Sequence, residues 1–292
     1  MSAGAITVER GRDHERRGRR PGVGTVYRWE LRKLRVQKRT YIGIGAALLV
    51  PVIFVVALLA DGSGGGPDGV PFGRYVRESG LAVPLVSLSF GSIWLMPLIT
   101  ALVAGDIVAT EDHNGTLKTI LTRSVDRWQV FAGKALAALT YAAVALAAFV
   151  AIGLLLGGLA WGFDPVTSLS GTRVGVGRGV LLIGAATLAY FLPLAATAGI
   201  GLLLSTVTQN SAASVVGTLM FSIILQLLGI ISALDFLQPY LLSTQFNAWE
   251  GLLREPIDWA PIVRGAWVSA LYGLPCVAAA VAVFLRRDVA GG

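Results

Sequence analysis

Residues 105–134, GDIVATEDHNGTLKTILTRSVDRWQVFAGK, form a short polar and charged segment between two long apolar ones. Apolar runs of about 20 residues are long enough to cross a bilayer as helices. A polar connection this short must lie at one membrane face, beside the ends of the helices that it joins. The segment therefore indicates a polytopic helical membrane protein, and its cluster of charges with a Gly-Thr step favours a surface that contacts another protein.

The composition of the whole chain supports this class of fold. Of the 292 residues, 54% are hydrophobic and only 14% are charged, and the mean hydropathy is +0.69. Soluble domains carry about 25% charged residues. Six spans would leave no room for a soluble catalytic domain, and the single cysteine, Cys276, excludes an intrachain disulfide. The net charge of +7 fits a membrane surface better than nucleic acid, because of where the cations lie.

The apolar runs predict an all-α protein with six transmembrane helices that together form one domain, residues 41–288. Pro51, Pro84 and Pro97 predict bends within the first two spans. Residues 235–264 are rich in aromatic and aliphatic side chains, which predicts short re-entrant or interfacial helices at a membrane face. The predicted spans are 42–60, 81–108, 129–159, 179–205, 213–234 and 265–285.

Two basic regions precede the first span. Residues 1–23 have the composition of a disordered cytoplasmic tail. Residues 24–40 predict an amphipathic interface helix that lies in the membrane plane, with its tryptophan at headgroup depth and its cations toward lipid phosphates. The predicted membrane-facing residues are Trp29, Arg32, Lys33, Arg35 and Lys38.

The positive charges predict the orientation of this topology. With six spans, 18 Lys and Arg fall on the side of the termini and the central segment, and six fall on the other side. The positive-inside rule then places both termini and the central segment in the cytoplasm. The expected location is the plasma membrane, and the Ala-, Gly- and Arg-rich composition points to a bacterium.

Several chemistries are absent from the sequence. It contains no G-x-x-x-x-G-K-[ST] motif, so it has no P-loop nucleotide site of its own. The only histidines, His14 and His113, lie in different regions, and no zinc constellation or nucleophile elbow is visible. We therefore expect no enzyme activity and no cofactor or metal in this chain. Residues 179–234 carry no charge, which disfavours an ion-coupled carrier.

The central segment itself predicts a short helix. Gly115 permits a sharp turn after the second span, and Thr116 is a suitable N-cap. Leu117, Ile120 and Leu121 share one helical face at i, i+3, i+4 spacing. From the residues alone, this helix is either a docking surface for a partner or an ordinary interfacial loop.

The sequence EDHNGTL at residues 111–117, followed by Leu121, Arg127 and Gly133-Lys134, resembles the signature of type-2 ABC exporter permeases. That signature comprises an acidic residue, a Gly-Thr step, a Leu-rich turn, a short Pro-x-x-Arg segment and a Gly-Lys pair that opens the third span. The terminal FLRRD, residues 284–288, is also similar to the usual ending of this family. Ser124 and His113 depart from the pattern, which has Pro and a second acidic residue there.

The resemblance implies the transmembrane permease subunit of an ABC transporter that works as an exporter. It implies further that this subunit acts as a homodimer or as a heterodimer with a related permease. ATP and Mg²⁺ would bind to separate ABC ATPase subunits, and the helix after span two would be the coupling helix that docks on them. Two alternatives stay open: a transporter or channel that works without an ATPase, and a non-transporting immunity or sensor component of the membrane. The implied docking residues are Glu111, Asp112, Gly115, Thr116, Leu117, Leu121 and Arg127.

Overall fold

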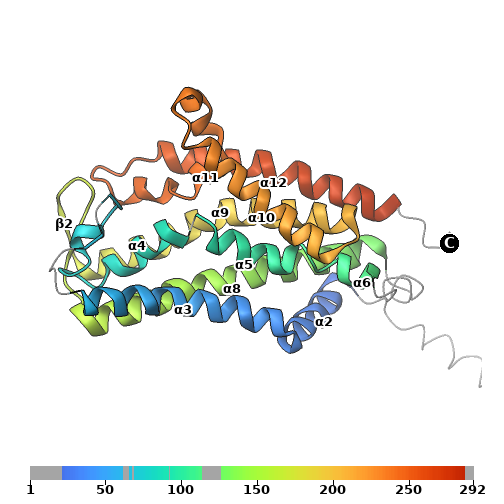
Figure 1. The fold of residues 1–292 in the computed structure, drawn as a ribbon, viewed down its shortest axis with the longest axis horizontal. Helices are drawn as coiled ribbons and strands as arrows, with labels where there is room; N and C mark the ends of the chain where they lie inside the picture. Colours follow the sequence, from blue (N-terminus) through green and yellow to red (C-terminus); the bar gives the residue numbers. More distant parts are fainter. Residues whose placement is uncertain (1–21, 62–65, 68, 92, 114–125, 287–292) are drawn as a thin grey trace, which may run out of the picture.

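The computed structural model of the chain describes residues 22–61, 66–67, 69–91, 93–113 and 126–286. In these residues the predicted all-α class is confirmed, because helices lie along the long axis of the molecule and make up nearly all of it (Figure 1). The sheet in this part of the chain is one small antiparallel hairpin. Its strands are β1 (Val166–Thr167) and β2 (Arg173–Val174), with Val166 opposite Val174.

Five helices of the described residues are long and apolar enough to cross a membrane. A sixth crossing results if α4 (Ala82–Gly91) and the helical run from Leu95 to Glu111, which are bent by 62° at their junction, count as one span. Each of the six predicted spans falls on one of these helices or on this pair. The five are α3 (Lys38–Ala60), α8 (Arg127–Trp161), α9 (Val176–Thr208), α10 (Ser211–Leu228) and α12 (Ala260–Arg286).

The bend in the second apolar segment lies between Gly91 and Leu95, where α4 ends and α5 (Leu95–Ala104) begins. Pro84 and Pro97 are not themselves at the bend: each lies in the first turn of its helix. The first turn has no intrahelical acceptor for its N–H groups, so proline costs no hydrogen bond there. The two prolines thus begin the half-helices on either side of the break.

Helix α10 ends at Leu228, rather than at Leu234 as the hydropathy predicts. The chain then continues through short helices, as the sequence of residues 235–264 predicts. They are η2 (Ser232–Tyr240), α11 (Leu242–Gln245) and η3 (Ala248–Leu253). Trp249 is fully buried in η3, and its ring stacks on Phe72 with 6.3 Å between centroids.

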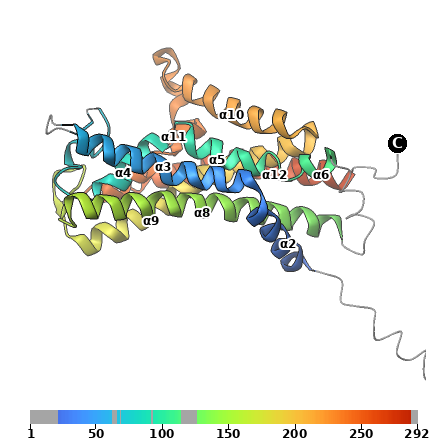
Figure 2. The same cartoon turned by 60° about the horizontal axis from the view of Figure 1, so that its bottom comes forward.

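The bundle has two different ends (Figure 1). At one of them lie α2 (Val23–Val36), α6 (Ala109–His113) and the C-terminal part of α12, and we call it the charged end. The opposite end contains η1 (Gly73–Tyr75), the β1–β2 hairpin and η3, and we call it the aromatic end. Figure 2 shows that α2 leaves the line of α3 and projects from the bundle.

Candidate functional site

Helix α2 contacts α8 through a face made of Val26, Glu30 and Leu34, which follow one another at i, i+4, i+8 and are buried. The two helices approach closely at Gly133, where an added Cβ would lie 2.6 Å from Cγ1 of Val26. The Tyr27 hydroxyl and Thr140 Oγ1 are 2.8 Å apart and form a hydrogen bond between the same helices. This packing carries the Glu30 carboxylate into the interior.

Four side chains from three helices form an ion-pair cluster around this carboxylate. We call Glu30, Lys33, Glu111 and Lys134 the charge cluster. Lys33 Nζ lies 3.0 Å from Glu30 Oε1 and 2.5 Å from Glu111 Oε1. Lys134 Nζ lies 2.6 Å from Glu111 Oε2 and 3.3 Å from Glu30 Oε1. The cluster joins α2, α6 and α8 through two cations and two anions, so its formal charges cancel.

The cluster extends from the interior, where an unpaired charge would be costly, to Lys33, whose side chain is 42% exposed. Lys134 is 0% exposed and Glu30 is 4% exposed. Lys134 Nζ also donates to the Ile107 carbonyl at 3.1 Å, so both carboxylates and a backbone dipole compensate its burial. Burial lowers the pKa of Lys33, but the hydrogen bond and charge of Glu111, with those of Glu30, outweigh it and raise that pKa above 10.5.

A second polar network centres on Asp106, which is buried five residues before Glu111. Arg39, near the start of α3, forms an ion pair with its carboxylate. The hydroxyls of Thr110 and Ser211 both donate to Asp106 Oδ1. The carboxylate at the end of the second apolar segment is therefore tied to α3 and α10.

Two more serines bind the backbone of the same segment. Ser205 Oγ of α9 accepts from the N–H groups of Val108 and Ala109, at 3.2 and 3.0 Å. Ser214 Oγ of α10 donates to the Gly105 carbonyl. Together with the charge cluster and the Asp106 network, these bonds link residues 105–111, which we call the junction segment, to α2, α3, α8, α9 and α10.

The start of α8 is also fixed to the end of α12. Arg127 Nη1 donates to the Leu285 carbonyl at 3.2 Å. One turn along, the rings of Phe131 and Phe284 pack with centroids 5.6 Å apart. These two contacts join the start of α8, which follows the central segment, to the C-terminal end of α12.

The predicted docking residues divide into two groups. Glu111 and Arg127 are described, and both bind other helices of the chain, as above. Gly115, Thr116, Leu117, Leu121 and the side chain of Asp112 lie outside the described residues. The structure thus describes the two ends of the predicted docking surface.

The predicted membrane-facing residues of segment 24–40, four in α2 and Lys38 at the start of α3, also divide. Trp29 is 45% exposed, and Arg32, Arg35 and Lys38 are exposed as well. Lys33 instead turns toward the protein and joins the charge cluster. The face of α2 that packs on the bundle contains Glu30 rather than Trp29.

Sequence reasoning overlooked Glu30 and Arg39 and gave Lys134 and Asp106 no charged partner. The sequence did contain one signal for Glu30. It is the only acidic residue of α2, and it lies on the same helical face as Val26 and Leu34. A carboxylate on an apolar face must find a cation or hydrogen-bond donors. The partner residues have no comparable local signal, because they are distant in sequence.

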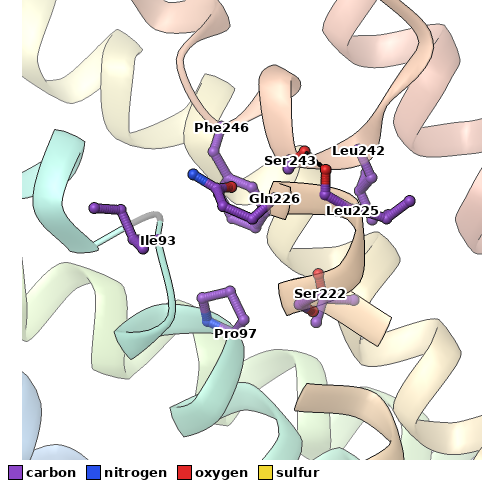
Figure 3. Close-up of a pocket in the computed structure, with 9 residues that line it drawn as sticks. Ile93, Pro97, Ser222, Leu225, Gln226, Leu242, Ser243 and Phe246 are labelled. Carbon is purple, nitrogen blue, oxygen red and sulfur yellow. Dashed lines mark hydrogen bonds between the residues drawn. The ribbon is translucent and has the colours of Figure 1, made fainter. Parts of the chain in front are cut away.

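A small pocket lies beside the bend between α4 and α5 (Figure 3). Its volume is about 10 Å³, room for about one water molecule. Ser243 donates to the Leu225 carbonyl at 2.9 Å, and the Gln226 amide lies among apolar side chains. The lining residues come from α5, α9, α10 and α11 and from the bend itself. The pocket therefore places polar side chains next to the break in the second apolar segment.

A larger and almost wholly apolar groove of about 390 Å³ lies between α8, α9 and α12. Small residues form much of it, and at Gly273 an added Cβ would lie 3.1 Å from Cα of Ala196. Ser269 Oγ is buried in its wall and has no hydrogen-bond partner in the described part of the chain. Such close helix contacts through small residues are typical of helices that pack within a membrane.

Comparison with known proteins gives a family. The sequence profile described as "Protein of unknown function (DUF2705)" matches residues 48–290. No curated protein matches the chain. Within the described residues, no group of three or more His, Cys, Asp or Glu side chains is arranged to hold a metal ion.

Proposed function

The chain belongs to the DUF2705 family of proteins of unknown function, and from its charged end we propose that it is the transmembrane subunit of an ATP-driven transporter. The observation that carries the proposal is the junction segment, residues 105–111, which is bonded to five helices at once. A force applied just after this segment would reach most of the bundle. An ordinary interfacial loop needs no such connections.

The partner in this proposal is a separate ABC ATPase, which holds ATP and Mg²⁺, since the chain has no P-loop. The sequence EDHNGTL and its resemblance to type-2 ABC exporter permeases assign the docking contact to residues 111–121. Cargo leaves the cell by a path between two permease subunits, either two copies of this chain or this chain and a related one.

The connections of the junction segment give a mechanism for coupling. Closure of the ATPase pair displaces the docking loop and, with it, Glu111. Glu111 transmits the displacement to α8 through Lys134 and to α2 through Lys33. Asp106 transmits it to α3 through Arg39 and to α10 through Ser211. The spans thereby tilt together between inward- and outward-facing arrangements.

In this proposal six spans cross the plasma membrane of a bacterium, the α4–α5 pair being one of them, and the charged end faces the cytoplasm. The distribution of Lys and Arg supports this orientation, with 18 on the side of the charged end and six on the other. The aromatic end then lies at the outer membrane face.

Co-purification from native membranes tests the proposal. A tag on this chain should recover a stoichiometric P-loop ATPase. Leu117→Asp, in the predicted docking helix, should lose that ATPase and leave the melting temperature of the chain unchanged. The control is Phe236→Asp, which makes the same kind of change at an exposed apolar residue of η2 and should retain the ATPase.

Two results would contradict the proposal. Recovery of a well-folded chain without any ATPase would point to a transporter or channel that needs none, or to a sensor or immunity component. Purified chain in vesicles then distinguishes these, since only the transporter or channel moves a solute. If the Leu117→Asp variant still recovered the ATPase, the ATPase would remain the partner, but residues 111–121 would not be its docking surface.

A further inference from the structure

The face of α2 that points away from the bundle carries a stripe of arginines. Arg28, Arg32 and Arg35 follow one another at i, i+4, i+7 and are all exposed. They lie on the side of the helix opposite to Val26, Glu30 and Leu34, which pack on α8. None of the three arginines forms an ion pair with a described residue. We call them the arginine stripe.

Among the residues that the structure describes, no carboxylate pairs with the arginines of the stripe. Glu30 is the only carboxylate of α2, and it is buried and paired with Lys33 and Lys134. Because the charge cluster is itself neutral, it leaves none of its negative charge for the stripe. The exposed face of α2 therefore presents an uncompensated row of guanidinium groups, which bind phosphates bidentately.

The residues beside the stripe indicate which anion covers it. Trp29 and Val36 are exposed next to the arginines, Val36 with 82% of its surface, and Tyr41 and Ile42 are exposed where α3 begins. The Tyr41 hydroxyl donates to the Arg35 carbonyl at 2.6 Å and so fixes the corner between α2 and α3. Arginines beside exposed apolar residues at the start of an apolar helix match the boundary between lipid headgroups and acyl chains.

We propose that the arginine stripe binds the headgroups of anionic phospholipids, and that this contact sets the position of Glu111 through Glu30 and Lys33. The second half rests on the proposed function, because it matters only if a partner docks beside Glu111. The physical route is short: the stripe and the cluster are opposite faces of one helix, and Lys33 Nζ bonds to both carboxylates. Anionic lipid thus holds α2 in the orientation that places Glu111 for docking.

Fluorescence quenching in nanodiscs tests the lipid contact without any ATPase. Cys276 is the only cysteine, so Val36→Cys in a Cys276→Ala background gives one fluorophore site beside the stripe. Brominated phosphatidylglycerol should quench this fluorophore at much lower mole fraction than brominated phosphatidylcholine, and salt should weaken the preference. Each cation at a membrane surface contributes about fivefold to lipid association, so Arg28, Arg32 and Arg35→Gln together should lower it about a hundredfold.

Two matched variants control for net charge and for folding. Arg173, Arg254 and Arg264→Gln removes the same charge from exposed arginines outside the charged end and should retain the preference for phosphatidylglycerol. Arg28, Arg32 and Arg35→Lys keeps the charge and should retain most of it. Equal quenching of the wild-type chain by the two lipids would overturn the proposal. So would stripe variants that keep lipid selectivity but lose a protein partner, since the stripe would then bind an acidic protein.

The transmitted effect is tested with the ATPase complex. Phosphatidylglycerol should raise the ATPase rate of the wild-type complex severalfold. Lys33→Met should abolish that rise, while a fluorophore attached at Val36→Cys in the same variant is still quenched by brominated phosphatidylglycerol. A Lys33→Met complex that remains fully stimulated would refute the link through Lys33. If lipid selectivity is present but no ATPase ever co-purifies, the lipid-binding surface stands and the proposed transport function fails.

Discussion

The charged end and the aromatic end hold the same bundle of helices together by different means. At the charged end, buried Glu30, Lys134 and Asp106 are satisfied by ion pairs and hydroxyl donors. At the aromatic end, Trp249 and Phe72 fill the space between short helices as stacked rings. Aromatic packing sums many weak contacts and favours a few ring arrangements, whereas a buried ion pair depends on a few short contacts between opposite charges.

This difference shows what each end is suited for. Replacing a whole buried ion-pair cluster by apolar residues is often neutral for stability, whereas removing one member is costly. The charge cluster therefore adds little that packing alone would not supply, except a fixed position of Glu111 relative to α2 and α8. The charged end is suited to transmit a movement, and the aromatic end is suited to close the bundle.

Among the substitutions that test this difference between the two ends, Lys134→Met should have the largest effect on stability. It leaves the carboxylates of Glu30 and Glu111 without their buried cation, so we expect a loss of about 3–5 kcal/mol in the free energy of unfolding. Denaturant unfolding in detergent micelles measures it. The control is Lys134→Met combined with Glu30→Gln and Glu111→Gln, which should recover a large part of the loss. If Lys134→Met alone were as stable as the wild type, the cluster could not be buried.

Trp249→Ala is the corresponding change at the aromatic end. It removes a fully buried ring that stacks on Phe72, and we expect a loss of about 3 kcal/mol from the cavity. The same unfolding assay applies, with Trp249→Phe as the smaller-volume control. Since the proposed docking surface lies at the other end, ATPase co-purification at low temperature should persist. Its loss would show that the two ends are not separable.

Glu111→Gln sharpens the contrast at the junction segment. The amide retains the side-chain size but loses the charge that faces Lys33 and Lys134, so we expect a loss of about 2 kcal/mol. In the proposed function Glu111 transmits the displacement from the ATPase, so ATPase stimulation by cargo should fall further than stability alone explains. A variant that loses stability but keeps normal coupling would assign Glu111 a purely structural role.

The smallest effect concerns pH. The pKa of Lys33 is raised in the folded chain above its ordinary 10.5, so the stability from its charge is complete below that pH. This stability is lost as the pH rises through the folded pKa. The difference in unfolding free energy between wild type and Lys33→Met should stay constant from about pH 7 to 10 and shrink above that. A difference that shrinks already between pH 7 and 9 would exclude the raised pKa.

The class of fold and the positions of the long helices follow from local features of the sequence. Apolar runs long enough to span a bilayer are a local property, and water or lipid selects the helix for each run independently. Composition likewise distinguished the basic amphipathic helix from the first span, since residues 24–40 alternate cations with apolar side chains and residues 42–60 are almost wholly apolar. The hydropathy of residues 229–234 was misleading, because apolar residues also suit the turn and short helices that follow α10.

Which charges pair with one another depends instead on how the helices pack. Glu30 and Lys134 are 104 residues apart, and Lys33 and Glu111 are 78 apart. No periodicity connects positions at such distances, so the sequence assigned Lys33 to the membrane surface and Glu111 to a partner. Packing of α2 on α8 at Gly133 brings the four side chains together, because charges carried into an interior must neutralise one another there.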